Sequence, residues 1–178
     1  MGYAVQLYFN AELEAALLEV RTALTKAGVT PTLERLGDRP HVSLSVLNDV
    51  DVQRCITMIE QFANSQSAFR TGFAAFGAFP TAQGVVYLSP APNEALLTAH
   101  RVMHQRLVDI GAQIHEYYFP DGWIPHATMG FELSSKEVAL ALSWLHGNFK
   151  PVGGIFASLG LIEFPPVKEI ATFELCAL

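Results

Sequence analysis

Two short segments of the sequence place a histidine and a hydroxyl residue at the same spacing. His41 and Ser43 lie in PHVSLSV, and His126 and Thr128 lie in IPHATMGF. In both segments a proline precedes the histidine and a large apolar residue follows the hydroxyl residue. Of the six histidines, only these two have a serine or threonine two positions later. One such pair is weak evidence, because a lone histidine on a strand is more often a hydrogen-bonded structural residue. The repetition favours a functional role.

This spacing predicts acid–base chemistry on phosphate. Side chains two positions apart on a strand share a face, so each histidine points the same way as its hydroxyl residue. Two imidazoles that face across a cleft suit general acid–base catalysis near neutral pH. The hydroxyl groups can donate to phosphate oxygens, and preorganised donors stabilise the negative charge that develops there. Cleavage of a phosphodiester by in-line attack needs such a base and such an acid, and no metal is required.

Five further residues near these segments are candidate substrate contacts, each with a structural alternative. Tyr8 and Tyr87 contact the substrate if their strands flank the cleft, although aromatic packing is the favoured interpretation. Arg39 can pair with a phosphate at the cleft mouth, and a solvated loop arginine is an equal alternative. Tyr118 or Trp123 can stack on a base. Aromatic residues beside proline and glycine also commonly attach a loop to the core.

Other motifs carry less weight. His100 and His104 have the His-x-x-x-His spacing that can bind zinc. No glutamate lies between them as in zincins, and His100 lies on the apolar side of its helix, so a core histidine is favoured. The chain lacks a phosphate-binding Gly-x-x-x-x-Gly-Lys-Ser/Thr loop and a Gly-x-Gly-x-x-Gly fingerprint. ATP-dependent ligation is therefore not expected, and neither a metal nor another cofactor is predicted.

The elements that must position these residues follow one order twice. Apolar periodicity and turn residues predict strand, helix, motif strand, helix and strand, and then the same order again. The first set comprises a strand at 3–9, a helix from Asn10 to Gly28, the motif strand at 41–46, a helix capped by Asn48 or Asp49, and an extended segment at 68–79. The second set comprises a strand at 85–89, a helix from Asn93 to Gly111, the motif strand at 126–131, a helix opened by Ser134 and Glu137, and strand-like runs near 155–163 and 169–177.

The motif histidines, His41 and His126, lie 85 positions apart, which is close to half the chain. This favours a duplicated architecture over a short-period solenoid. No linker rich in proline, serine or glycine divides the halves, so we expect one bilobal domain over 1–178. Its approximate half-repeats are 1–82 and 83–178, allowing for tail strands that cross over. The predicted fold is α+β with two pseudo-symmetric lobes. Each lobe is a mostly antiparallel sheet with helices on its outer face, and the two sheets face one another across a central cleft.

Composition narrows the function classes. The 178 residues are 51% hydrophobic and 16% charged, which predicts a large core and no long disordered tail. The net charge is −6 and the 11 lysines and arginines are scattered. A broad nucleic-acid groove is therefore disfavoured, whereas a compact site for one or two phosphates is not. No apolar run reaches the length of a membrane span. Cys55 and Cys176 are expected to be free thiols in the cytoplasm.

PHVSLSV and IPHATMGF resemble the paired His-x-Ser/Thr signatures of the two-histidine (2H) phosphoesterase superfamily. That superfamily includes RNA 2′,3′-cyclic phosphodiesterases and 2′-5′ RNA ligase-like proteins. The resemblance covers nearly the whole chain and includes the GVVYLSPAP strand before the second motif. It implies that His41 and His126 are catalytic and that Ser43 and Thr128 bind phosphate. Ser43 replaces the commoner threonine and keeps the hydroxyl group.

The resemblance further implies metal-independent hydrolysis of a 2′,3′-cyclic phosphate or a 2′-5′ bond. The expected ligand is a small nucleotide or an RNA end carrying a cyclic phosphate. Long duplex nucleic acid and membranes are not expected partners, and a monomer is expected. The alternative is a non-catalytic binder of phosphorylated ligands or RNA ends on the same scaffold.

Overall fold

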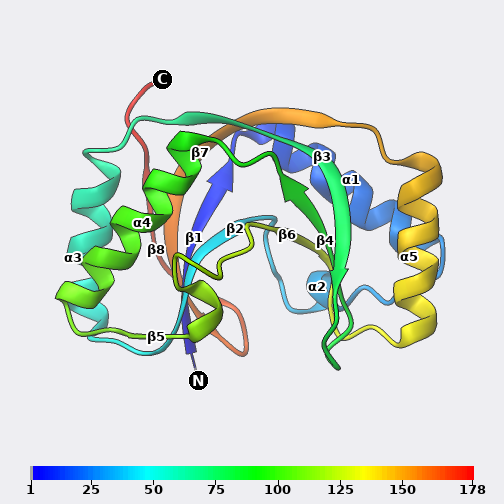
Figure 1. The fold of residues 1–178 in the computed structure, drawn as a ribbon, viewed down its shortest axis with the longest axis horizontal. Helices are drawn as coiled ribbons and strands as arrows, with labels where there is room; N and C mark the ends of the chain where they lie inside the picture. Colours follow the sequence, from blue (N-terminus) through cyan, green and yellow to red (C-terminus); the bar gives the residue numbers. More distant parts are fainter. Residues whose placement is uncertain (1) are drawn as a thin grey trace.

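A hydrogen-bonded sheet of eight strands runs through the computed structural model, which describes residues 2–178, and helices cover its outer sides (Figure 1). The strands follow the order β5-β2-β1-β7-β3-β4-β6, and β8 pairs with β7. Every pair of neighbouring strands is antiparallel, so the predicted α+β class and antiparallel pairing are confirmed. The strands are β1 Gly2–Phe9, β2 Val42–Asp49, β3 Phe69–Phe79, β4 Val85–Pro90, β5 Gln113–Ile114, β6 Ala127–Gly130, β7 Val152–Phe164 and β8 Lys168–Glu174.

The helices form two groups on opposite sides of the molecule (Figure 1). On one side α3 contacts β7 and β8, and α4 contacts β2 and β5. On the other side α5 contacts β3 and β4, and α1 contacts β1, β6 and β7. The helices are α1 Ala11–Lys26, α2 Thr32–Arg35, α3 Val52–Ala63, α4 Glu94–Asp109 and α5 Ser135–Asn148, with a 3-10 turn at Glu116–Tyr118.

The predicted starts of α1, α4 and α5 agree with the structure, and the predicted start of α3 differs. Asn93 accepts from the Leu96 amide at the start of α4, and Ser134 forms a capping box with Glu137 at the start of α5. The predicted cap of α3 at Asn48 or Asp49 is wrong: β2 continues to Asp49, and the side chain of Asp51 accepts from the Arg54 amide. The short helix α2 and the two-residue strand β5 lie in segments that the sequence predicts only as loop or helix end.

The long strand β7 joins the two lobes. One edge of β7 pairs with β1. The other edge pairs with β3 over 152–156 and with β8 over 158–163. The motif strands lie outside this junction in matching places, because β2 pairs with β1 and β6 pairs with β4. In these two pairs Gln6 lies opposite Ser43, and Tyr87 lies opposite Thr128.

The apolar faces of both motif strands are buried in one core. Val42 and Leu44 of β2 and Ala127 of β6 have no exposed surface, and Met129 is 3% exposed. This alternation, with apolar side chains on one face and polar side chains on the other, is the one predicted from the sequence. Burial of the apolar face fixes the register of each strand, since a one-residue slip would move every side chain to the opposite face. The histidine and hydroxyl side chains are thereby held on the other face.

Two further findings concern membrane-spanning helices and the cysteine thiols. Among residues 2–178, no helix has both the length and the hydropathy of a membrane-spanning helix. Cys55 is buried and Cys176 is exposed, and both are free. Burial raises the pKa of the Cys55 thiol to about 12.

Candidate active site

A cleft of about 820 Å³ lies between the motif strands β2 and β6. Its lining includes His41 and Ser43 from the first motif and His126 and Thr128 from the second. The structure therefore brings together four residues that the sequence separates into two distant pairs. The shared polar face of each strand explains this, because the opposite face of each strand is buried in the core.

The two histidines are held by the same backbone contact. Nδ1 of His41 lies 2.7 Å from the carbonyl oxygen of Arg39, and Nδ1 of His126 lies 2.8 Å from the carbonyl oxygen of Ile124. A carbonyl oxygen only accepts, so each Nδ1 carries the hydrogen and donates it. Pro40 or Pro125 stands between the two partners, and a proline fixes its own φ and keeps the preceding residue extended. Each imidazole thus has its Nε2 as the nitrogen that this backbone contact does not use.

The surroundings of His41 are polar. The side-chain nitrogen of Gln6 lies 3.0 Å from Nε2 of His41, and the hydroxyl of Tyr8 donates to Oε1 of Gln6 at 2.9 Å. Burial raises the pKa of Tyr8, so its phenol keeps the proton it donates. A carboxylate oxygen of Asp38 lies 3.5 Å from Nδ1 of His41. Neutral His41 can accept from Gln6 at Nε2, while the Asp38 carboxylate lies beside its Nδ1.

The surroundings of His126 are mostly aromatic. The ring of Phe79 meets the imidazole edge to face, with the ring centres 4.8 Å apart, and the ring of Tyr87 lies at 5.6 Å. Burial lowers the pKa of His126, and the nearby His41 lowers it further, while the hydrogen bond to Ile124 acts in the opposite direction. The neutral imidazole is therefore favoured at position 126. The two histidines match in backbone geometry but differ in charge environment.

The buried Arg21 connects the two motifs, and sequence reasoning missed it. Its guanidinium donates to the carbonyl and the carboxylate of Asp38 at 2.6 and 3.0 Å, and to the carbonyl of Thr128 at 2.8 Å. Arg21 is 1% exposed. It follows Leu17 by four positions and precedes Leu24 by three, so it lies on the apolar side of α1. A charged residue on that side is the signal that could have identified it.

Gln6 and Asp38 are the other site residues whose role the sequence did not reveal. Gln6 lies two positions before Tyr8 on β1 and is 4% exposed. Asp38 precedes His41 by three positions in a segment without periodicity. Both line the cleft. A buried amide and a buried carboxylate need partners, but their partners come from other elements, which a single sequence does not identify.

Tyr8, Tyr87 and Arg39, which were predicted as possible substrate contacts, are not among the residues that line the cleft. Both oxygens of the Glu14 carboxylate accept from the Arg39 guanidinium at 2.7 Å, and this guanidinium lies 4.4 Å above the Tyr8 ring. The structure therefore pairs Arg39 with Glu14 rather than placing it in the cleft lining. Tyr87 stacks on Phe79, with the ring centres 4.4 Å apart, and both rings pack against the His126 imidazole.

Tyr118 and Trp123 do line the cleft, but Trp123 is fixed to the core. Its ring stacks on His100 with centres 3.8 Å apart, and its indole nitrogen donates to the Ser43 carbonyl at 3.2 Å. Trp123 thus packs as an aromatic residue that attaches its loop to the core, which was the structural alternative to base stacking. Burial raises the pKa of Tyr118 to about 12, although its interaction with the Ser43 side chain acts in the opposite direction. Both residues therefore contact Ser43 of the first motif.

His100 is a core residue, as its helical position predicts. It is 2% exposed, and its Nε2 donates to the Tyr118 carbonyl at 3.1 Å. Burial lowers its pKa to about 4, so the ring is neutral near pH 7. The ring centre of His104 lies 6.5 Å from that of His100. Within residues 2–178, no three histidine, cysteine, aspartate or glutamate side chains are grouped so that they could hold a metal ion.

Solved structures share this architecture over nearly the whole chain. TT0787 of Thermus thermophilus has a TM-score of 0.64 and 17% identity, with 99% of each chain covered. Escherichia coli LigT complexed with 3′-AMP has a TM-score of 0.62 and 15% identity, with 97% of this chain and 96% of LigT covered. LigT complexed with NADP+ has a TM-score of 0.61 and 14% identity, with 98% of this chain and 96% of LigT covered. At these identities the likeness shows the fold.

Sequence comparisons identify the family. A search of curated proteins finds no match to the chain. The sequence profile of the 2′-5′ RNA ligase superfamily matches residues 33–165, a span that includes both His-x-Ser/Thr motifs. That span is well over half of the 178 residues, and the shared architecture agrees with it. The chain therefore belongs to the 2′-5′ RNA ligase superfamily, within the two-histidine phosphoesterases that its motifs resemble.

Proposed function

We propose that the protein is a metal-independent phosphodiesterase that hydrolyses a 2′,3′-cyclic phosphate or a 2′-5′ linkage. The observation that supports this is the pair of imidazoles in one cleft, each with Nδ1 bonded to a backbone carbonyl and each beside a hydroxyl residue. An in-line displacement at phosphorus needs one group to take a proton and another to give one.

The difference between the two environments assigns the roles in this proposal. His126 begins neutral, because burial lowers its pKa, and its Nε2 takes a proton from the attacking water. The water oxygen then bonds to phosphorus while the bond from phosphorus to the ribose oxygen breaks. The other imidazole, His41, must then give an Nε2 proton to the departing ribose oxygen, and the Asp38 carboxylate 3.5 Å from its Nδ1 can balance that charge before the transfer. The products are a phosphomonoester and a free ribose hydroxyl, and proton exchange with solvent restores both histidines.

Ser43 and Thr128 are proposed to hold the phosphate during this step. Each lies two positions after its histidine on a strand, so its hydroxyl lies on the same face as the imidazole. Donation to the non-bridging oxygens stabilises the charge that develops on them. Ser43 is 8% exposed, so its hydroxyl is largely shielded from bulk water, and such bonds are stronger in a shielded site.

The comparisons support this class of reaction and ligand. Membership of the 2′-5′ RNA ligase superfamily is consistent with phosphoesterase or ligase-like chemistry. LigT, which shares the fold, has been solved with 3′-AMP and with NADP+, and this supports a small nucleotide as ligand. Hydrolysis is preferred over ATP-dependent ligation because the chain has no glycine-rich triphosphate loop.

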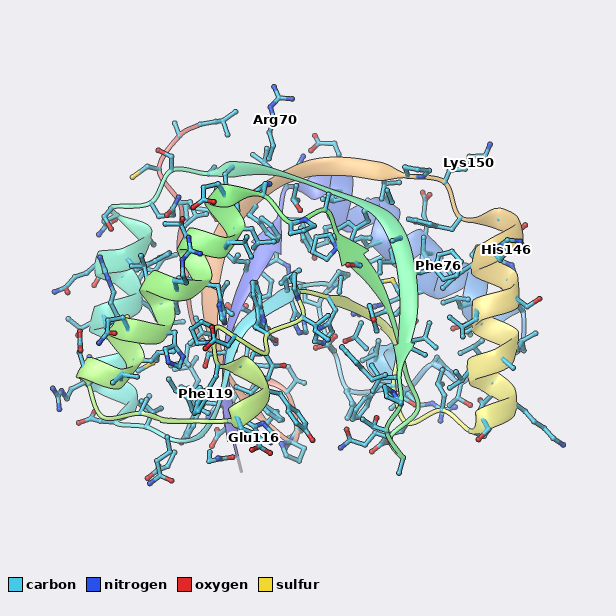
Figure 2. All side chains as sticks on the ribbon, viewed as in Figure 1. Arg70, Phe76, Glu116, Phe119, His146 and Lys150 are labelled. Carbon is cyan, nitrogen blue, oxygen red and sulfur yellow. The ribbon has the colours of Figure 1, made fainter. Side chains whose placement is uncertain are left out.

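Turnover by purified protein tests the proposal. The substrates are 2′,3′-cyclic nucleotides, oligonucleotides with a cyclic-phosphate end and 2′-5′-linked dinucleotides, all assayed with and without EDTA. We expect EDTA-insensitive hydrolysis of at least one class, with kcat/KM reduced about 10²–10⁴-fold in His41→Ala and in His126→Ala. The matched control is His146→Ala, because His146 is exposed on α5 at the outer edge of the molecule (Figure 2). Full activity in either motif variant would exclude the mechanism.

A non-catalytic binder is the second candidate, and one contact favours it. The amide of Gln6 already occupies Nε2 of His41, the atom that must exchange a proton. If Gln6 stays there when ligand is bound, the cleft binds phosphate without cleaving it. Tight binding that yields no product and does not vary between pH 5 and 8 would support the binder over the enzyme.

A further inference from the structure

The cleft contains few positive charges. Among residues 2–178, those that line it include no lysine and no arginine, and its charged side chains besides the histidines are Asp38 and Glu132. Arg21 and Arg39 lie next to the motif residues, but each is paired with a carboxylate. Arg21 is 3.0 Å from Asp38, and Arg39 is 2.7 Å from Glu14. The lining side chains that can carry a positive charge towards a ligand are therefore the two histidines, when they are protonated.

This charge pattern limits the ligand. A phosphodiester carries one negative charge, which one imidazolium can balance. Sites for several phosphates use lysine and arginine, whose charge and donors match the extra oxygens. In this cleft a second phosphate would meet the Glu132 carboxylate with no lysine or arginine in the lining to balance it, and Asp38 is already paired with Arg21. The repulsion is stronger in a partly enclosed site than in bulk water, because the effective dielectric constant is lower.

Apolar side chains form most of the remaining lining. They come from the β3–β4 turn, from the end of β7 and the turn after it, and from the segment before β6. Two of them, Tyr117 and Ile124, are 65% and 49% exposed. Flat, uncharged groups such as nucleobases pack well on surfaces of this kind. The apolar residues with this location are Phe79, Pro80, Val85, Phe164, Pro165, Val167, Tyr117, Tyr118 and Ile124.

We propose that the cleft selects a singly charged cyclic phosphodiester attached to an uncharged nucleoside, and that it discriminates against the same group carrying further phosphates. The preferred substrate is thus a 2′,3′-cyclic mononucleotide with a free 5′-hydroxyl rather than an RNA end. This inference rests on the proposed function and narrows its substrate class.

The same charges favour release of the product. Hydrolysis converts the singly charged diester into a monoester, whose second pKa is about 6, so the product is mostly doubly charged at pH 7. It then faces Glu132, and a lining without lysine or arginine, with one more negative charge than the substrate had.

Three adenosine substrates test the selectivity at one low ionic strength. These are 2′,3′-cyclic AMP, its 5′-phosphorylated form and a short oligonucleotide ending in a 2′,3′-cyclic phosphate. We expect kcat/KM to fall about tenfold on 5′-phosphorylation, which corresponds to about 1.4 kcal/mol. The difference should shrink as salt is added, because salt screens charge repulsion. An equal or higher kcat/KM for either phosphate-bearing substrate would overturn the inference.

Two cleft variants separate charge from shape. Glu132→Gln removes a carboxylate, and Thr81→Lys adds a cation at an exposed position of the lining. Both variants should bring kcat/KM for 5′-phosphorylated 2′,3′-cyclic AMP closer to kcat/KM for 2′,3′-cyclic AMP, which narrows the ratio of the two values. Glu19→Gln is the matched control, since it makes the same charge change on the exposed face of α1, outside the cleft lining. A ratio unchanged in both cleft variants, or narrowed equally by Glu19→Gln, would contradict the role of local charge.

Failure of this inference is distinguishable from failure of the proposed function. If the substrates are hydrolysed without discrimination, the phosphodiesterase proposal stands and the selectivity fails. If none is hydrolysed, the phosphodiesterase proposal fails, and equilibrium binding of the same three compounds to wild-type protein decides the selectivity. Tightest binding of 2′,3′-cyclic AMP would support the selectivity, and tightest binding of a compound with further phosphates would overturn it.

Discussion

Replacing Arg21 by methionine should destabilise the fold far more than replacing a surface arginine. The guanidinium is 1% exposed and donates to Asp38 and to the Thr128 carbonyl. Methionine keeps an apolar stem but leaves the Asp38 carboxylate, which is 9% exposed, without its partner. Removing one member of a buried ion pair costs about 3–5 kcal/mol of unfolding free energy. For a chain of this length, that lowers Tm by roughly 6–20 °C.

Urea denaturation and calorimetry measure this effect, with Arg101→Met as the matched control. Arg101 pairs with Glu94 at 3.0 Å, but the two side chains are 55% and 83% exposed, so the loss should be at most about 1 kcal/mol. A third protein combines Arg21→Met with Asp38→Asn. It should recover part of the lost stability, because no uncompensated charge is then buried.

We also expect Arg21→Met to lower the catalytic rate at temperatures where the variant is fully folded. Arg21 joins the segment before His41 to the strand that carries Thr128, so its loss should let the two motifs move apart. A displacement of about 1 Å can cost about 10²-fold in rate. The reasoning would be refuted if the unfolding free energy of Arg21→Met lay within about 1 kcal/mol of wild type. It would also be refuted if the double variant lost as much unfolding free energy as the two single variants added together.

The remaining predictions concern Gln6 and two titrating groups. Gln6→Leu leaves the buried Tyr8 hydroxyl without its acceptor and should cost about 1–3 kcal/mol, whereas adding Tyr8→Phe should restore most of the loss in urea denaturation. The rising limb of the kcat/KM profile should lie below pH 6.5, since burial lowers the pKa of His126, and Phe79→Ala should move it to higher pH by admitting water; a limb unmoved by Phe79→Ala would contradict this. Hydrogen bonds from Ser134 and Thr30 lower the pKa of Glu137 to about 2. Its stabilisation is therefore complete above the ordinary pKa of 4.5 and lost as pH falls towards 2, so the stability difference between wild type and Glu137→Gln should vanish across that range in acid titrations of Tm.

The motif strands could be predicted from the sequence because their information is local. Alternation of polar and apolar residues places His41 with Ser43 and His126 with Thr128, and burial of the opposite face holds both strands in that orientation. The order of elements and the α+β class follow from the same kind of pattern. Even the proline before each histidine has a local reason, since it fixes the backbone between the imidazole and the carbonyl that it contacts.

Contacts between distant segments could not be predicted. Arg21 and Thr128 lie 107 positions apart. The hydrogen bond between them forms because α1, from the first half of the chain, packs against β6 in the second half. Arg39 illustrates the same dependence on distant partners. Its closeness to His41 in sequence suggested a phosphate contact, but the turn of α1 that carries Glu14 takes up its guanidinium. Charge partners of this kind require the tertiary arrangement.

A crystal structure of the protein with 3′-AMP bound tests the central claim most directly. The account predicts that the phosphate lies between the motif strands, with Nε2 of His41 and Nε2 of His126 each within about 2.6–3.2 Å of a phosphate oxygen. It also predicts that Ser43 and Thr128 donate to the same group and that the Gln6 amide has moved off His41. A phosphate bound elsewhere, or one that reaches a single imidazole while Gln6 still holds the other, would contradict it.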